Sequence, residues 1–245
     1  MFSLEGRRAL VTGASGLLGA RFARVLHGAG AEVVLAARRT QACAALAEEL
    51  GARAMAVALD VASPASVAAA LDAAGPLDIL VNNAGIAATR PFLEHRLEEW
   101  DAVMGVNLRG AFLVAQQAAR RMVEAGRGGS IIHVASILGE RVIPGVASYT
   151  AAKAGLLHLT RQMAVELARH RIRVNALAPG YVASELNRDF FASEPGQAMI
   201  RRIPFRRLGQ PDDLDGPLLL LASDAGRYMT GSVLTVDGGH SVAPL

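Results

Sequence analysis

The stretch that decides the fold is Ala9-Leu10-Val11-Thr12-Gly13-Ala14-Ser15-Gly16-Leu17-Leu18-Gly19, near the amino terminus. The apolar residues 9–11 predict a short buried strand, and a helical pattern over 17–29 follows directly after the glycine-rich turn. Glycines at such a turn let backbone amides approach a pyrophosphate, whose negative charge the helix N-terminus stabilises. The stretch therefore predicts the first βα unit of a dinucleotide-binding fold. The alternative is an ordinary glycine-rich turn.

The same alternation of strand and helix continues along the chain. Further strands are predicted at 33–36, 54–59, 78–81, 130–134, 173–177 and 233–236, and further helices at 40–50, 64–73, 97–125, 149–169 and 211–223. Strands that are apolar throughout and alternate with helices are typical of a parallel sheet covered on both faces. We predict an α/β fold: one Rossmann-type, doubly wound domain over 1–245, with a mostly seven-stranded parallel sheet. The segment 181–208 breaks the rhythm and is predicted to be a substrate lid.

Composition limits the classes of function. The chain is 52% hydrophobic, 19% charged and 4% aromatic, with a formal net charge of +3, which excludes a disordered chain and argues against a nucleic-acid partner. We find no apolar run of membrane-spanning length and no signal peptide, so we expect no membrane partner. The single cysteine, Cys43, fits a reducing compartment, and we expect a cytoplasmic protein. The six histidines show no metal-ligand spacing, and no metal is expected.

The end of the second predicted strand bears on the choice of cofactor. An acidic residue there would hydrogen-bond the adenosine ribose and favour NAD(H). Ala37 stands there instead, followed by Arg38 and Arg39, whose guanidinium groups could bind a 2′-phosphate. We therefore predict NADP(H) as the preferred cofactor, with NAD(H) as the alternative. In that alternative, both arginines are simply solvated at the start of a helix.

Two later strands are predicted to end at the same cofactor. Asp60, with Val61 beside it, follows the third strand and is placed to meet the adenine. The residues after the fourth strand could border the adenine ribose and the nicotinamide half. The cofactor residues predicted so far are Gly13, Ser15, Gly16, Leu18, Gly19, Arg38, Arg39, Asp60, Val61, Asn83, Ala84 and Gly85.

Catalysis is predicted at Tyr149 and Lys153, which lie four residues apart on a helix and therefore share one face. Lys153 is the only lysine among the 25 Lys and Arg residues. A nearby ammonium favours the phenolate of a tyrosine, whose ordinary pKa near 10 must fall for efficient proton exchange at neutral pH. Ser136 ends the fifth strand, and its hydroxyl could stabilise an alkoxide that develops on a substrate carbonyl. Taken singly, each of these residues would more often be structural.

These residues occur in an order that resembles the short-chain dehydrogenase/reductase family of the classical type, over essentially the whole chain. The matching residues are Thr12-Gly13 with Gly19, Asp60, Asn82-Asn83-Ala84-Gly85, Asn107, Ser136, Tyr149 with Lys153, Pro179-Gly180 and Val236-Asp237-Gly238-Gly239. Within that family the chain is similar to 3-oxoacyl-carrier-protein reductases and to gluconate- or glucose-type dehydrogenases. The resemblance implies hydride transfer between a nicotinamide cofactor and a ketone or secondary alcohol, the small-molecule substrate, and it implies a homotetramer.

The resemblance also assigns roles to single residues. Tyr149 would be the acid in reduction and the base in oxidation, while Lys153 would lower its pKa and hold the nicotinamide ribose. Ser136 would orient the carbonyl, and Asn107 would bend its helix and hold a water that relays protons to Lys153. Further residues assigned to the cofactor are Pro179, Gly180, Val182 and Ser184.

One position departs from the family pattern. The family's usual turn, TGxxxGxG, has a glycine where this chain has Leu17, and Gly16 instead gives the TGxxGxxG spacing of the extended branch. Because Gly13 and Gly19 still match, we expect cofactor binding to survive with an altered loop path. The positive residue that NADP-preferring members often carry in this loop is missing, so Arg38 and Arg39 are the main support for NADP(H).

The favoured reaction is NADPH-linked reduction of a carbonyl or 3-oxoacyl group. The alternatives are an NAD-dependent sugar or polyol dehydrogenase and a non-catalytic nucleotide-binding protein of the same fold. Residues predicted to rim the substrate pocket are Arg141, Ile143, Pro144 and Val146, with Phe190, Phe191 and Met199 as an apolar lid or as core. Four arginines, 201, 202, 206 and 207, could attract an acidic substrate, although a solvated helix face is favoured.

Overall fold

A parallel sheet of seven strands forms the centre of the computed structural model, which describes residues 2–185 and 187–243. The strands are β1 (Arg8–Thr12), β2 (Glu32–Ala37), β3 (Ala54–Ala58), β4 (Ile79–Asn82), β5 (Gly129–Val134), β6 (Ile172–Pro179) and β7 (Val233–Val236). Their order is β3-β2-β1-β4-β5-β6-β7, so the chain starts in the middle of the sheet and winds outward in both directions. The predicted doubly wound α/β fold is confirmed.

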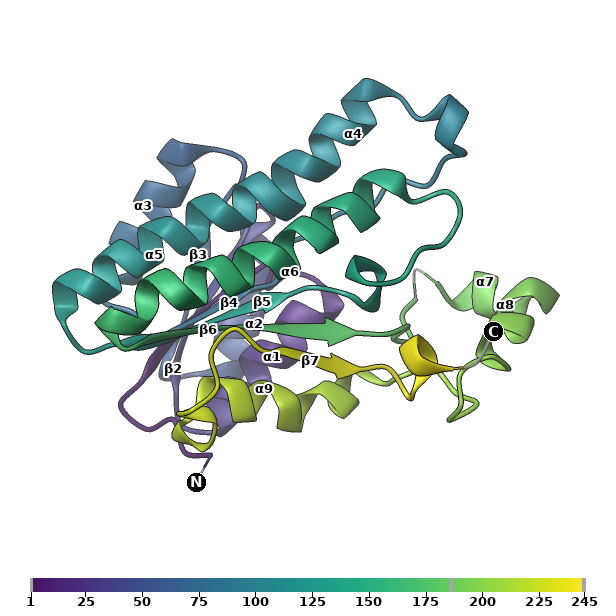
Figure 1. The fold of residues 1–245 in the computed structure, drawn as a ribbon. Helices are drawn as coiled ribbons and strands as arrows, with labels where there is room; N and C mark the ends of the chain where they lie inside the picture. The colour runs from purple at the N-terminus through teal and green to yellow at the C-terminus, as the bar shows by residue number, and fades with distance from the viewer. Residues whose placement is uncertain (1, 186, 244–245) are drawn as a thin grey trace.

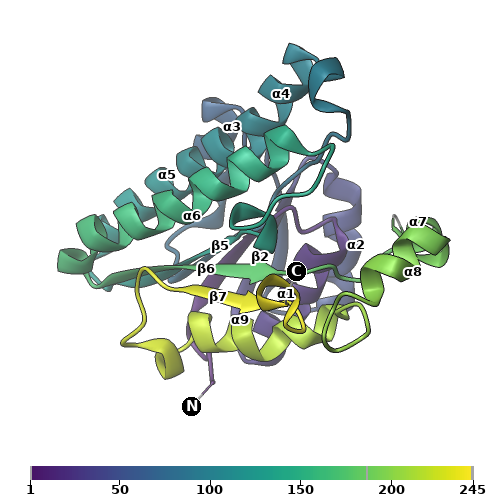
Figure 2. The ribbon, with the colours of Figure 1, turned by 45° about the vertical axis from the view of Figure 1, so that its right-hand side comes forward.

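Helices cover both faces of this sheet (Figure 1). The helices of the face shown below the sheet are α1 (Leu17–Gly28), α2 (Thr40–Leu50) and α9 (Asp215–Ala222). The helices of the opposite face are α3 (Pro64–Ala74), α4 (Leu97–Met104), α5 (Ala111–Ala125) and α6 (Ala147–Leu167). Two short helices, α7 (Arg188–Ala192) and α8 (Glu194–Ile200), lie beyond the carboxyl ends of β6 and β7 (Figure 2).

The apolar strands are explained by a core on each face of the sheet. In β1, Val11 packs into the core that contains Phe22 of α1, while its neighbour Leu10 packs into the core that contains Met122 of α5. Because successive strand residues point to opposite faces, a strand covered on both sides is apolar at every position. This arrangement leaves the strand ends as the place for polar chemistry.

The segment 97–125, predicted as one helix, is helical throughout but is not regular. Between α4 and α5 it passes through a π-helical stretch, Gly105–Gly110. The chain passes close to Val61 here, because a Cβ added to Gly110 would lie 2.8 Å from the Val61 Cγ2 atom. Wide turns of this kind are frequent at functional sites, and Asn107 lies in its middle.

Among its described residues, the predicted lid segment, 181–208, has no strand of the sheet, as expected, but it contains α7 and α8. These helices pack tightly, since a Cβ on Gly196 would overlap the carbonyl oxygen of Phe190. Ser193 connects them and accepts a hydrogen bond from the amide of Gly196 at 3.4 Å, which caps α8.

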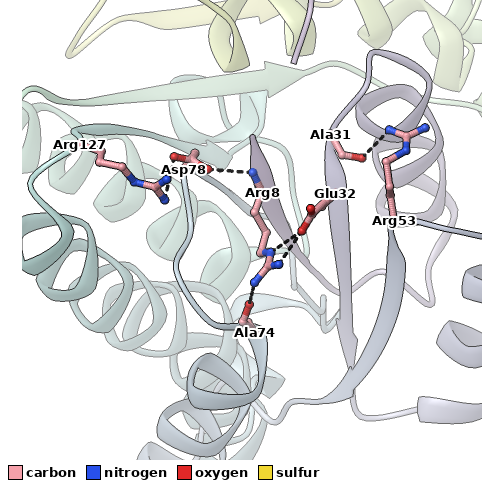
Figure 3. A network of polar contacts seen from close by, with 7 residues as sticks. All are labelled: Arg8, Ala31, Glu32, Arg53, Ala74, Asp78 and Arg127. Carbon is pink, nitrogen blue, oxygen red and sulfur yellow. Dashed lines mark hydrogen bonds and ion pairs between the residues drawn. The ribbon is translucent and has the colours of Figure 1, made fainter. Parts of the chain in front are cut away.

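A polar network joins the strands at their amino ends (Figure 3), which lie at the opposite edge of the sheet from α7 and α8 (Figure 1). The Arg8 guanidinium donates to the Glu32 carboxylate at 2.6 and 2.8 Å and to the Ala74 carbonyl at 3.1 Å. The Asp78 carboxylate accepts from the backbone amide of Arg8 at 2.9 Å and pairs with Arg127 at 3.3 Å. The Asp78 side chain is 6% exposed and its partner Arg127 is 53% exposed, so the carboxylate is shielded from water while the guanidinium is not. The network ties β1 to β2 and to the segment that precedes β4.

Candidate active site

Two adjoining clefts open at the carboxyl ends of the strands, on either side of Leu18, Asn83, Gly85, Ile86 and Val182, which line both. The first, called the cofactor cleft here, is lined in addition by Gly13, Ser15, Gly16, Leu17, Gly19, Ala37, Arg38, Arg39, Leu59, Asp60, Val61, Ala84, Val106 and Ser184. The second is called the substrate cleft. Its further lining residues are Ala87, Thr89, Val134, Ala135, Ser136, Ile137, Leu138, Ile143, Val146, Tyr149, Lys153, Pro179, Gly180, Tyr181, Asn187, Phe190, Phe191 and Met199.

The structure brings the predicted residues together at these clefts. The predicted residues of the first four strand ends line the cofactor cleft, together with Val182 and Ser184. Pro179 and Gly180 line the substrate cleft with Ser136, Tyr149 and Lys153. Sequence reasoning missed Leu59, Ile86 and Val106, because an apolar side chain beside a cleft has the same sequence signature as one in the core.

The glycine turn forms a cradle that side chains would fill. Gly13 has a φ of +66°, and a Cβ there would lie 2.9 Å from the Cα atom of Ala84. A Cβ on Gly19 would overlap the carbonyl oxygen of Gly13. Gly16 precedes α1, and no side chain caps the helix there. An uncapped helix N-terminus beside bare backbone fits the pyrophosphate of a dinucleotide.

Leu17, which stands at the position of the usual middle glycine, is the first residue of α1. Its side chain is half exposed and lines the cofactor cleft. Gly16 is less constrained than Gly13 and Gly19, because a Cβ there would lie 3.4 Å from the nearest atom, the Gly13 carbonyl oxygen. The two glycines that match the family pattern are therefore the two that packing requires.

The two arginines after β2 differ in their surroundings. Arg39 donates to the Ser15 carbonyl at 3.1 Å and to the Ser15 hydroxyl at 3.4 Å, which ties it to the glycine turn. Arg38 is exposed and lines the same cleft. Both lie directly before α2, which begins at Thr40. Their guanidinium groups are thus positioned beside the turn that holds the phosphates in this type of fold.

Thr12 organises the junction between the first and fourth strands. Its hydroxyl oxygen accepts hydrogen bonds from the backbone amides of Asn83 and Ala84, both at 2.9 Å. The Asn83 side chain donates back to the Thr12 carbonyl at 2.9 Å. Thr12 could be singled out from the sequence, because it is the first residue of the family's glycine motif. Its position at a strand end does not reveal that its hydroxyl binds the backbone after the fourth strand.

Tyr149, Lys153 and Ser136 line the substrate cleft together. Helix α6 begins at Ala147, so Tyr149 lies in its first turn and Lys153 one turn later. The Lys153 ammonium is 5.6 Å from the centre of the Tyr149 ring and donates to the Val134 carbonyl at 2.7 Å. The Ser136 hydroxyl follows β5 directly and accepts from the Leu138 amide at 3.1 Å. One hydroxyl, one phenol and one ammonium therefore face a shared space.

Burial sets the pKa values of this group. It lowers the pKa of Lys153 to about 8, and this residue is 4% exposed. Burial also raises the pKa of Tyr149, an effect that the Ser136 hydroxyl offsets only in part. The neighbouring Tyr181 phenol acts in the same direction as burial. The phenol therefore holds its proton at neutral pH.

Asn107 is 1% exposed and bonded on both sides of its carboxamide. Its oxygen accepts from the Ile86 amide and its nitrogen donates to the Ile86 carbonyl, each at 2.8 Å. A Cβ added to Gly85 would lie 3.5 Å from the Asn107 oxygen and 3.8 Å from the Lys153 ammonium. The π-helical stretch thus delivers Asn107 to the neighbourhood of Lys153.

The substrate cleft agrees only in part with the predicted rim. Ile143 and Val146 line it, and so do Phe190, Phe191 and Met199 of the lid segment. Arg141 and Pro144 are exposed and are not among the lining residues. The Arg141 guanidinium instead donates to the carbonyl of Ser241 at 2.8 Å, a residue one hundred positions later in the chain.

Three further findings concern other kinds of site. Within residues 2–185 and 187–243, no helix is long and apolar enough to cross a membrane. The same residues contain no group of three His, Cys, Asp or Glu side chains that could hold a metal ion. Cys43 is buried in α2 as a free thiol.

Comparisons with known proteins cover nearly the whole chain. The family described as Enoyl-(Acyl carrier protein) reductase matches residues 13–241. The gluconate 5-dehydrogenase of Gluconobacter oxydans (strain 621H) is 39% identical over 99% of this chain and 98% of its own length. The L-rhamnose 1-dehydrogenase (NAD(P)(+)) of Azotobacter vinelandii (strain DJ / ATCC BAA-1303) is 43% identical over 96% of this chain and 97% of its own.

Among solved structures, a gluconate 5-dehydrogenase from Burkholderia cenocepacia J2315, in complex with NADP and tartrate, superposes with a TM-score of 0.95. It is 41% identical, and the match covers 99% of this chain and 98% of that one. Relatives at this level of identity and coverage share the family as well as the fold.

Proposed function

The chain belongs to the short-chain dehydrogenase/reductase family, and on that premise we propose that it reduces a ketone or 3-oxoacyl group with NADPH, using Tyr149, Lys153 and Ser136 as its acid–base group. It is an NAD(P)-dependent oxidoreductase that acts on CH–OH or C=O groups. The observation that carries the proposal is the meeting of these three side chains in the substrate cleft, which adjoins the cofactor cleft.

The residues of the cofactor cleft fit a dinucleotide. The glycine turn and the N-terminus of α1 would hold the pyrophosphate, and Asp60 would meet the adenine. Arg38 and Arg39 would bind the 2′-phosphate, which is the reason to favour NADP(H) over NAD(H). Further residues that would border the nicotinamide half are Pro179, Gly180, Val182 and Ser184. When bound, the cofactor supplies the hydride for reduction or accepts it in oxidation.

The chain's own residues handle the proton. The Ser136 hydroxyl and the Tyr149 phenol would both donate hydrogen bonds to the substrate carbonyl oxygen, which stabilises the negative charge that develops there. Tyr149 would then transfer its proton to that oxygen. The phenol carries a proton at neutral pH, as an acid must, and Lys153 would lower its pKa toward the range in which proton transfer is efficient. Lys153 and Asn107 would return a proton to Tyr149 afterwards.

A second candidate is oxidation of sugar acids or polyols. It is favoured by the relatives described as gluconate 5-dehydrogenases and as a D-threitol dehydrogenase, the latter 37% identical. The non-catalytic alternative is disfavoured, because a binding protein has no need for a buried ammonium beside a phenol.

Four further properties belong to this proposal. The chain is one domain over 1–245, and the segment 181–208 is its lid, since α7 places Phe190 and Phe191 against the substrate cleft. A homotetramer is supported by the exposed side chains of Phe112 on α5 and Val165 on α6. A cytoplasmic location is supported by the free thiol of Cys43.

The proposal is tested by Tyr149→Phe, which removes the donated proton and leaves the ring. Loss of a general acid costs about 100-fold to 10,000-fold in rate, so we expect kcat to fall by at least about 100-fold while the Kd for NADPH stays within about threefold. Tyr228→Phe is the matched control, because Tyr228 is fully exposed. Full turnover by the Tyr149 variant would refute the assignment, and NADPH binding without turnover of any carbonyl would favour the binding protein.

A further inference from the structure

The side chains that form the wall of the substrate cleft indicate the chemical class of the substrate. This inference rests on the proposed function. Around the hydroxyls of Ser136 and Tyr149, the wall is built from hydrocarbon side chains of three separate segments. These side chains are Ile86, Leu138, Ile143, Val146, Phe190 and Phe191. The two phenylalanines of α7 stack edge to face with ring centres 5.1 Å apart, which makes this side of the cleft a continuous apolar surface.

The polar side chains that line the cleft are largely committed elsewhere. The Asn187 carboxamide accepts from the Ser184 amide at 2.9 Å and donates to the Val182 carbonyl at 2.8 Å. The hydroxyl of Tyr181 is the exception, because it is buried and has no hydrogen-bond partner among the described residues. Lys153 is bound to the Val134 carbonyl. Apart from the catalytic hydroxyls, Thr89 and Tyr181 are left to meet a substrate hydroxyl among the described lining residues, which is few for a polyol.

Three arginines of the segments 137–146 and 181–208 do not supply a positive charge to this wall. Arg141 is directed to the Ser241 carbonyl, Arg188 pairs with Glu185 at 2.7 Å, and Arg207 pairs with Asp213 at 2.6 Å. None of the three is among the described residues that line the substrate cleft. The other arginines of the second segment, Arg201, Arg202 and Arg206, are exposed and are not among the described lining residues either.

A sugar acid is poorly matched to such a wall. A carboxylate moved from water against hydrocarbon loses its hydration, and without a cation nothing replaces it. Each buried hydroxyl of a polyol likewise needs a partner, and the wall offers few. We propose that the substrate is an uncharged, predominantly hydrocarbon ketone or secondary alcohol, in contrast to the sugar acids named for the relatives.

The test compares two aryl ketones that share one skeleton and differ in charge and in one ester methyl group: methyl 4-acetylbenzoate and 4-acetylbenzoate. With NADPH, we expect kcat/KM to be at least tenfold higher for the ester than for the acid, and 5-ketogluconate to be a poorer substrate than either. Equal values, or a preference for either carboxylate, would overturn the proposal. If the acid is preferred and Arg141→Ala removes that preference, the carboxylate receptor is Arg141.

A second variant tests the wall itself. Ile143→Arg places a cation in the cleft, and we expect the ester-to-acid ratio of kcat/KM to shift toward the acid by at least tenfold. Ile143→Gln is the control for polarity without charge and should shift the ratio much less. Thermal unfolding and the Kd for NADPH establish that both variants are folded. An unchanged ratio in a folded Ile143→Arg protein would place the substrate elsewhere and overturn the proposal.

Failure of this inference is distinguishable from failure of the proposed function. If the protein is not a carbonyl reductase, none of the three ketones is reduced, and Tyr149→Phe changes nothing. If only the substrate class is wrong, 5-ketogluconate or the acid is reduced in a Tyr149-dependent way.

Discussion

His133 should make the stability of this protein depend on acidity. It lies on β5, one residue before the carbonyl that holds Lys153, and its side chain is fully buried. Neither ring nitrogen has a hydrogen-bond partner among the described residues. Burial, with a further contribution from the charge of Lys153, lowers its pKa from the ordinary 6.5 to about 3.

The sign follows from the number of protons bound. Between pH 6.5 and about 3, the unfolded chain carries a proton on His133 and the folded protein does not. Stability from this residue is therefore complete above pH 6.5 and is lost as the pH falls. At pH 4.5, two pH units below the ordinary value, the loss is about 2.7 kcal/mol at ~1.36 kcal/mol per unit. That is a large share of the ~5–15 kcal/mol typical of a folded domain.

The assay is urea unfolding followed by circular dichroism at pH 7.5, 5.5 and 4.5, for the wild type and for His133→Met. We expect the free energy of unfolding to fall more steeply with acid in the wild type, with the difference between the proteins changing by about 2.7 kcal/mol over this range. His158→Gln is the matched control, because His158 is exposed on α6. Parallel pH dependences of the wild type and His133→Met would refute the reasoning.

Two further predictions concern the cofactor cleft. Gly19→Ala forces a Cβ onto the Gly13 carbonyl, so we expect the Kd for NADPH to rise at least tenfold and the melting temperature to fall. Gly28→Ala, at a position with open space, is the control and should change neither. Arg39→Ala should weaken NADPH by about 10- to 100-fold, the worth of a charge-assisted hydrogen bond of ~1.5–3 kcal/mol, and leave the Kd for NADH within about threefold. An unchanged Kd for NADPH, measured by fluorescence titration, would contradict the 2′-phosphate role.

The order of strands and helices could be predicted because burial on both faces leaves a plain apolar pattern. The ends of the strands were harder to predict from the sequence. Strand β6 continues to Pro179, two residues beyond its predicted end, because β7 pairs with it there. The π-helical stretch around Asn107 has no distinct pattern, since its apolar spacing fits the helices on either side. Helices α7 and α8 are too short for periodicity to detect and depend on packing against each other.

Residues of the candidate site could be predicted from the sequence where their role requires one particular type of side chain. Glycines without room for a Cβ, a tyrosine with a lysine one turn later and paired arginines all carry such a signal. The sequence holds no signal for the direction in which a side chain points. Arg141 was predicted at the rim of the substrate pocket, but its guanidinium binds the Ser241 carbonyl. The raised pKa of Tyr149 was equally hidden, because it depends on how much of the surrounding chain excludes water.

The network of Arg8, Glu32, Asp78 and Arg127 has a consequence for how this molecule can diversify (Figure 3). It connects the strands at their amino ends, whereas every side chain proposed to contact the substrate lies at their carboxyl ends. Substitutions in the segments 137–146 and 181–208 therefore leave intact the contacts of this network, which stabilise the sheet that carries the catalytic residues. A mutant library confined to those two segments would change the substrate specificity and keep the contacts at the amino ends of the strands that stabilise the fold.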